Sequence, residues 1–172
     1  MARVPLKMMH EGGSSRRPIM KVGDPVELKG TRLIAASPDR LYRALTSPQV
    51  LVEAMPGLKK LEAIGPLQYE AEMEMGVASI RGRYQGQLQI QNPTPPQSYQ
   101  LTMTGQGSGG FINVSMEVEL TAQGSATAVH YTGDAKVGGK VAGVGQRLLG
   151  GVASLILSQF FGAIETHVRS PE

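Results

Sequence analysis

The chain has 172 residues, a length typical of a single domain, and a core of that size needs no metal or disulfide to hold it together. It contains no cysteine, which excludes disulfides, thiolate catalysis and cysteine-ligated zinc or iron–sulfur centres, and which is compatible with a reducing cytoplasm. The net charge of +3 comes from the first 21 residues, whose five basic residues and one acid give +4, so residues 22–172 carry −1. We therefore expect no nucleic-acid-binding surface on the body of the protein.

Residues 1–21 form a basic segment rich in Gly, Ser, Pro and Arg. This composition opposes packing, and no apolar stretch in it is long enough for a secretory signal. We expect a disordered tail, for which two origins stay open. It is either a genuine basic arm that touches anionic lipid or an extension upstream of a biological start at Met20. Residues 22–172 are expected to form a single domain.

The first predicted elements are one strand and two short helices. Residues 26–35 have the β-branched content and the length of a strand. The sequence SPD at 37–39 then supplies an N-cap, a proline at the first helical position and an acid in the first turn, which predicts a helix over 39–45. A second Ser-Pro pair at 47–48 predicts another helix over 49–54 that ends at a Pro-Gly turn.

For about 80 residues after this turn, apolar and polar side chains alternate with a period of two, which is typical of an antiparallel sheet with one wet face. The strand at 69–76 points its acids outward, and the strand that follows points its arginines outward. A hairpin would therefore bring glutamates close to arginines, in weak solvated pairs: Glu70, Glu72 and Glu74 with Arg81 and Arg83. The proline-rich residues 92–96 are expected to break the second of these strands.

Four glycines fall on the inner face of the predicted sheet: Gly82, Gly86, Gly105 and Gly133. Glycine lets a long strand bend around a helix, and it also leaves room for a ligand where the helix does not fill the concavity. We expect the strands to bend and a cavity to remain, with a filled core as the alternative.

A long C-terminal helix of about 28 residues is predicted within residues 138–167. Its polar residues fall in one narrow stripe, made of Lys140, Arg147, Ser154, Ser158 and Glu165. Most of the remaining circumference is apolar, so the helix must contact something on more than one side. At about 42 Å it matches a 12-residue strand of about 40 Å. We predict an α+β domain in which a curved antiparallel sheet of about six to seven strands wraps around this helix, with two short helices after the first strand.

The sequence shows no constellation for catalysis or metal binding. His10, His130 and His167 lack the spacing of metal ligands, and the acids of the sheet alternate outward rather than into a buried site. The glycine-rich residues 105–110 lie between two antiparallel strands and precede no helix, which favours a hairpin over a phosphate loop. We expect no enzyme activity, no metal site and no covalently bound cofactor.

The side chains expected to face the long helix mix methionine with tyrosine. Methionine adapts its shape and tyrosine adds a hydroxyl, which suits a pocket for a large apolar molecule with a few polar atoms. An ordinary core that uses methionine as filler is the alternative. The predicted cavity residues are Met73, Met75, Tyr84, Leu88, Tyr99, Met103, Met116, Tyr131, Val152, Ile156 and Phe160.

The uncharged run from Leu148 to Ile164 has 17 residues, the lower limit for a membrane span. Small and polar residues dilute the run, and the sheet offers it another partner. We expect reversible contact with a membrane or a partner protein through an exposed apolar flank of the helix, centred on Leu157 and Phe161.

Several short motifs are similar to those of a known family. They are MPG at 55–57, IRGRY at 80–84, PPQSY at 95–99, GQG at 105–107 and, most specific, DAKVGGK at 134–140, which runs into QRL at 146–148. Together with the order of elements, they make residues 26–161 resemble the carbon monoxide dehydrogenase G-subunit family, which is part of the START/Bet v 1-like (SRPBCC) helix-grip superfamily.

This resemblance implies a helix-grip fold and an accessory role for a molybdenum-containing carbon monoxide dehydrogenase. It implies recruitment of that enzyme to the inner face of the cytoplasmic membrane, a quinone or lipid-like ligand in the cavity, and no catalytic residues. Members often carry a linker and a hydrophobic anchor after this domain, whereas this sequence ends at Glu172, so we expect transient membrane contact. A homo-oligomer stays open, as do a purely structural adaptor with a filled core, a generic hydrophobic-ligand-binding START-like protein and a small-molecule-modifying enzyme of the superfamily.

Overall fold

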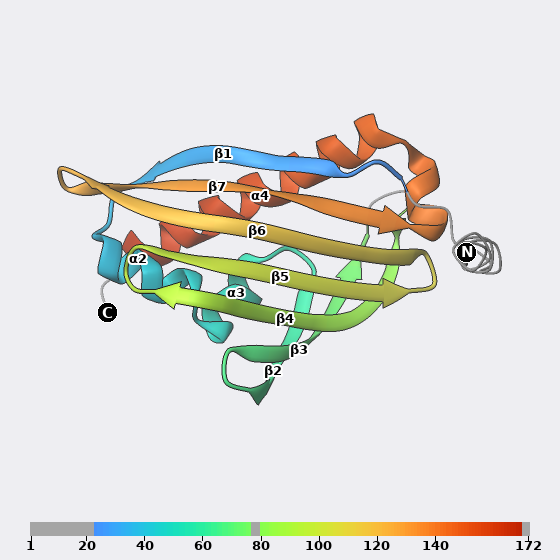
Figure 1. Cartoon of the computed structure of the whole chain (residues 1–172), viewed down its shortest axis with the longest axis horizontal. Coiled ribbons are helices and arrows are strands. Elements are labelled where there is room, and N and C mark those ends of the chain that lie inside the picture. The colour runs from blue at the N-terminus through green and yellow to red at the C-terminus, as the bar shows by residue number, and fades with distance from the viewer. Residues whose placement is uncertain (1–22, 77–79, 170–172) are drawn as a thin grey trace, which may run out of the picture.

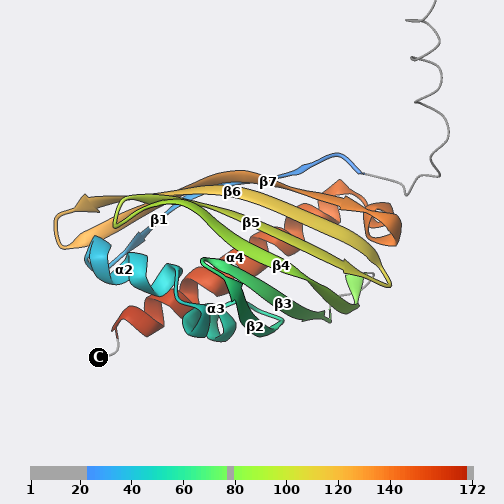
Figure 2. The same ribbon diagram turned by 60° about the horizontal axis from the view of Figure 1, so that its bottom comes forward.

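A computed structural model describes residues 23–76 and 80–169, and in it a seven-stranded antiparallel sheet curves around one long helix (Figures 1 and 2). The order of strands across the sheet is β1-β7-β6-β5-β4-β3-β2. The elements are β1 (Val26–Ile34), α2 (Pro38–Leu45), α3 (Pro48–Ala54), β2 (Leu58–Gly65), β3 (Gln68–Met75), β4 (Gly82–Thr94), β5 (Ser98–Gly107), β6 (Gly110–Gln123), β7 (Ala126–Gly138), the 3-10 turn η2 (Gly139–Val144) and α4 (Gln146–Arg169). The predicted fold class is confirmed, while the tail at 1–21 lies outside the described residues.

Local sequence signals determine where the two short helices begin. The hydroxyl of Ser37 accepts a hydrogen bond from the backbone N–H of Arg40 at 3.2 Å, and that of Ser47 accepts one from Val50 at 3.4 Å. Each bond satisfies one of the free N–H groups in a first helical turn. Both helices therefore begin at the proline after the cap, one residue before the predicted start.

The alternation predicted for the sheet is visible in β3, whose glutamates are exposed while Tyr69 and Ala71 are buried. Glu74 pairs with Arg83 across β3 and β4, and the Arg83 Nε lies 3.5 Å from a carboxylate oxygen of Glu74. The predicted hairpin contact is thus confirmed for this pair. Arg81 lies just before β4, which begins at Gly82, and not within a strand as predicted.

The proline-rich segment disturbs β4 without ending it. The strand continues to Thr94, but its register against β5 shifts between Gln91 and Thr94, and Asn92 has a φ of 49°. The prediction that this segment breaks the strand was therefore wrong about where β4 ends.

The long helix begins at Gln146, eight residues after the predicted start, and has 24 residues, or about 36 Å. Gly139 and Gly145 have φ values of 80° and 95°, which lie outside the right-handed helical region and confine residues 139–144 to a 3-10 turn. Val141 in this turn is fully buried, and its N–H donates to the carbonyl of Gly109 at 2.8 Å. The two glycines thus separate η2, which covers the end of the sheet, from the helix α4.

Candidate ligand cavity

The concave side of the sheet has two ends with different contents. At one end, α2, α3 and the C-terminal half of α4 fill the space with a large apolar cluster that includes Leu41, Phe160 and Ile164. At the other end, the N-terminal half of α4 and η2 cover a smaller cluster around Tyr84 and Val141. The short helices α2 and α3 both lie at the first end (Figure 2).

A cavity of about 180 Å³ occupies the second end. Its sheet side is formed by β1 and by β3 to β7, and α4 closes it with Leu149, Val152, Ala153, Ile156 and Leu157. The volume exceeds that of an engineered cavity of about 150 Å³ that binds benzene, and it is below the range of about 300–1,000 Å³ for sites of drug-sized ligands. The concavity is therefore not filled.

Methionine dominates the chemistry of the wall. All five methionines of the described residues line the cavity: Met55, Met73, Met75, Met103 and Met116. Methionine has three rotatable bonds and a polarizable sulfur, so such a wall can reshape itself around apolar groups of different sizes. The remaining wall is also almost wholly carbon, which gives the cavity the chemistry of a hydrocarbon site.

Tyr84 is the one tyrosine of the cavity wall, and its hydroxyl group already makes a hydrogen bond. It donates to the backbone carbonyl of Ile80 at 3.1 Å, and both residues are buried. Burial raises the pKa of Tyr84, so the ring stays neutral. Across the described residues, every fully buried side-chain nitrogen and oxygen has a hydrogen-bond partner, and the cavity wall is almost wholly apolar.

The sequence matches a known protein family over most of its length. A family model described as the carbon monoxide dehydrogenase G subunit (CoxG) matches residues 30–169. The chain belongs to the CoxG family. Its membership supports an accessory role associated with carbon monoxide dehydrogenase. No protein among the curated sequences is significantly similar to this member.

Solved structures show the same fold. A conserved protein from Geobacillus kaustophilus is 34% identical to this CoxG family member, with a TM-score of 0.81 over 84% of this chain and 95% of the other. A START superfamily protein from Mycobacterium smegmatis is 15% identical, with a TM-score of 0.65 over 83% and 97% of the two chains. Ara h 8.0201 is 16% identical, with a TM-score of 0.63 over 86% and 100%. The helix-grip fold implied by the resemblance is thus confirmed.

The structure brings seven of the predicted cavity residues of this CoxG family member to the cavity wall: Met73, Met75, Tyr84, Met103, Met116, Val152 and Ile156. It places the other four in the filled end. Leu88, Tyr99 and Phe160 are buried in the large cluster, and Tyr131 packs against that cluster with its ring 5.2 Å from Phe161. These four were wrongly predicted to line the cavity, because the elements that fill one end are distant in sequence from the strands they cover.

The predicted exposed flank of the helix also needs correction. Phe161 is 4% exposed, stacks on Tyr131 and lies under the guanidinium of Arg32 at 5.4 Å, so it cannot contact a membrane in this conformation. Leu157 is half-buried and lines the cavity. The large apolar side chains that α4 exposes are instead Leu148 and Leu155, at 43% and 50%.

Sequence reasoning missed several wall residues. Met55 follows α3 and was assigned only to a turn, while Val26, Leu28, Val141 and Ala153 were given no part in a cavity. Methionine content offers the one signal that could have found Met55, since every methionine from β1 onward faces the same space.

Proposed function

We propose that this chain is a non-catalytic accessory protein of a molybdenum carbon monoxide dehydrogenase system. In this proposal the cavity between sheet and α4 holds an apolar molecule, a quinone or a lipid-like compound, and the protein brings the enzyme to the inner face of the cytoplasmic membrane. The observation that carries the proposal is an unfilled, apolar cavity in a member of the CoxG family.

The cavity wall favours the hydrocarbon part of such a ligand. A carbonyl or hydroxyl group buried without a hydrogen bond costs about 1–3 kcal/mol, and the phenol of Tyr84 is engaged with Ile80. A prenyl or alkyl tail needs no such partner. The polar head of the ligand would therefore stay outside this apolar wall, and a tail longer than the present volume allows would require the methionines to move.

Two alternatives lose support from the same cavity. A structural adaptor was expected to have a filled core, which the cavity contradicts. An enzyme of the superfamily would need polar side chains that converge on the ligand, whereas the wall is almost wholly carbon and sulfur. A generic carrier of apolar molecules differs from the proposal only in its partner protein.

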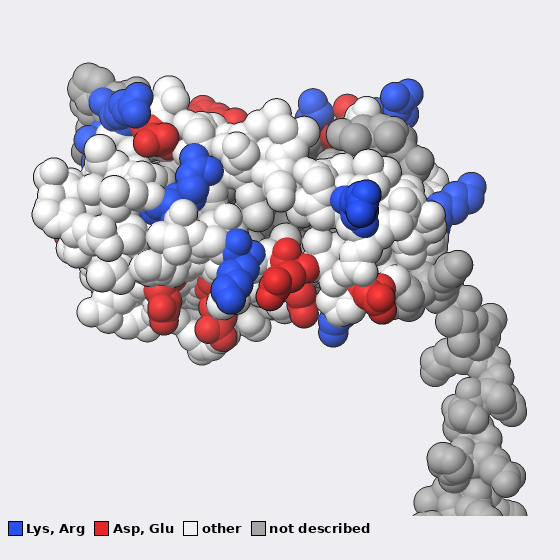
Figure 3. All heavy atoms as spheres, turned by 90° about the horizontal axis from the view of Figure 1, so that it is seen from above, with Lys and Arg blue, Asp and Glu red and all other residues white. Residues whose placement is uncertain are grey.

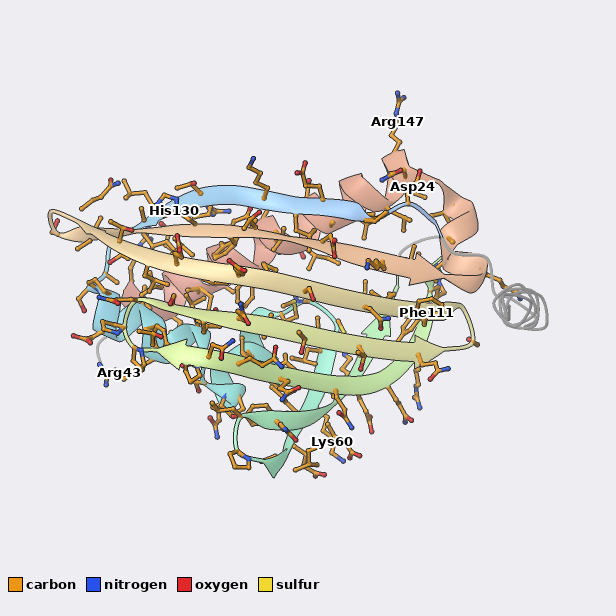
Figure 4. All side chains as sticks on the ribbon, in the orientation of Figure 1. Asp24, Arg43, Lys60, Phe111, His130 and Arg147 are labelled. Carbon is orange, nitrogen blue, oxygen red and sulfur yellow. The ribbon has the colours of Figure 1, made fainter. Side chains whose placement is uncertain are left out.

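Contact with a membrane is proposed for the outer side of α4. Among the described residues, α4 alone is long and apolar enough to cross a membrane, and 22% of its most apolar stretch is buried. Leu148 and Leu155 are two turns apart and thus lie on one side of the helix, beside the exposed Arg147 and Ser154. Figure 4 shows Arg147 pointing away from the sheet. Exposed leucines with a neighbouring cation suit reversible binding at an anionic lipid surface.

The ligand is tested with two probes that share a quinone head, one with a short prenyl tail and one without a tail. We expect the tailed quinone to raise the melting temperature and the tail-free quinone to leave it unchanged, because only the tail matches the wall. Solvent extraction of the protein purified from its own host, followed by mass spectrometry, should recover an apolar molecule.

Two variants of β7 provide the control. Ala135 lines the cavity, so Ala135→Phe should fill the space and abolish the thermal shift. Thr132 is exposed, and Thr132→Phe should retain the shift. Equal responses to both quinones, or a shift that survives Ala135→Phe, would show that the ligand does not use this cavity. Co-purification with the dehydrogenase tests the accessory role separately, since that role can fail while ligand binding holds.

A further inference from the structure

The sheet has a free edge at β2. This strand is the outermost of the sheet, and residues 59, 60 and 62–64 are all exposed. Figure 4 shows Lys60 at this edge, and α4 packs near the opposite edge strand, β1. An edge strand presents unpaired N–H and C=O groups along its length, which makes it a template for another strand.

The charges of β2 are arranged in a pattern that one more strand could complete. Lys60 and Glu62 lie on the convex face with their charged atoms 3.5 Å apart, and their side chains are 52% and 61% exposed. Across β2 and β3, Glu62 lies directly opposite Glu70. Two carboxylates in opposite positions repel one another, so a cation on the free side of Glu62 would stabilise this edge.

Side-chain alternation restricts how β2 can pair with a second copy of itself. In a symmetric antiparallel pair, opposite residues point to the same face of the sheet. The twofold axis must therefore lie between the two copies of one residue, which is then opposite itself. Register shifts at both ends of β2 leave Lys60 to Ala63 as the regular stretch, and an axis through Ala63 would extend the pairing across the second shift. An axis through Lys60 or through Glu62 would oppose like charges. An axis through Leu61 places Lys60 of each copy opposite Glu62 of the other.

We propose that β2 is a homodimer interface, in which two copies pair antiparallel about Leu61 and join their sheets. Two intermolecular Lys60–Glu62 pairs form on the convex face, and the half-buried Leu61 side chains meet on the concave face. One short strand offers much less contact than the roughly 1,600 Å² of a stable interface, so the dimer depends on concentration. This interface is separate from the cavity and does not rest on the function proposed above.

The experiment is light scattering after size exclusion, on the full chain, over concentrations from about 1 μM to 1 mM. We expect the mass to rise from monomer to dimer across this range. Lys60→Glu and Glu62→Lys should each weaken dimerisation by about tenfold or more, because each turns two attractive pairs into repulsive ones. A mixture of these two variants should dimerise again as a heterodimer. The glutamate at position 60 of one variant is then opposite the lysine at position 62 of the other, so opposite charges face each other. The double exchange K60E/E62K should dimerise by itself.

Lys29→Glu makes the same charge change on β1, at the opposite edge, and should leave the dimer unchanged; Lys29 is exposed, as Lys60 is. A monomer at every concentration overturns the proposal, as does a dimer that survives Lys60→Glu. If the chain is monomeric and Lys60→Glu blocks co-purification with the dehydrogenase, the edge binds a strand of that enzyme and the homodimer is wrong.

Discussion

Two glycines on the concave face show how differently the same residue type can act. Gly86 and Gly105 pair directly across β4 and β5. A Cβ on Gly86 would overlap the backbone carbonyl of Thr104, whereas a Cβ on Gly105 would meet the Cβ of Tyr84 at 3.7 Å, an ordinary contact. Gly86 is therefore required by the close approach of two backbones, while Gly105 only leaves space.

This difference predicts unequal effects of the same substitution. Gly86→Ala should lower the free energy of unfolding by about 2 kcal/mol or more, because the strands must separate. Gly105→Ala should change it by less than about 1 kcal/mol, since alanine fits and restricts the unfolded chain. Urea denaturation of both variants measures the two values. Equal losses would mean that both positions only bend the strand.

At the scale of elements, the two halves of α4 have different surroundings. Its C-terminal half is anchored: Phe160, Phe161, Ile164 and Val168 are buried against α2, α3 and β1. Its N-terminal half contacts the cavity on one side and exposes Leu148 and Leu155 on the other. The half of α4 that covers the cavity is thus also the half with exposed apolar surface.

We expect this surface to bind vesicles of phosphatidylglycerol and phosphatidylethanolamine, as measured by flotation. Leu155→Asp should weaken binding by about tenfold, because a leucine that enters the lipid interface contributes about 1.5 kcal/mol or more and an acid is repelled there. Leu33 on β1 is 58% exposed, which makes Leu33→Asp a matched control that should bind normally. If both variants lose binding equally, the decisive surface is not α4.

Charge on the face seen in Figure 3 is mixed. Lysines and arginines are dispersed among acids with uncharged atoms between them, and they form no continuous basic patch in this view. The expectation that the body of the protein does not bind nucleic acid rests on the charge of residues 22–172 and stays a prediction.

On the scale of the whole molecule, one end is packed and the other is hollow. The packed end holds most of the buried residues, and the hollow end is closed by η2 and the first half of α4. Segments with fewer packed neighbours open more easily, so stability should differ between the two ends.

Hydrogen exchange followed by mass spectrometry can measure that difference. We expect amides of residues 146–157 to exchange faster than those of residues 160–168, although both belong to α4. An apolar ligand in the cavity should slow exchange in residues 146–157 and in η2, with little change at the packed end. Uniform exchange along α4 would contradict this division of the helix.

Much of the fold was predictable because its signals are local. Serine followed by proline at 37–38 and 47–48 determines two helix starts, and alternation alone identifies the inner and outer faces of the strands. The start of α4 was missed because helical periodicity continues through residues 138–145, while the positive φ values of Gly139 and Gly145 depend on contacts such as Val141 with Gly109.

Which side chains face inward follows from the sequence alone, because alternate positions of a strand point to opposite faces of the sheet. This alternation places Met73, Met103 and Met116 on the concave face. Which of these inward side chains line the cavity depends on packing between distant segments, because α2, α3 and the second half of α4 fill one end and leave the other open. Met103 lines the cavity and Tyr99, four residues earlier on β5, is core, and no local pattern separates them.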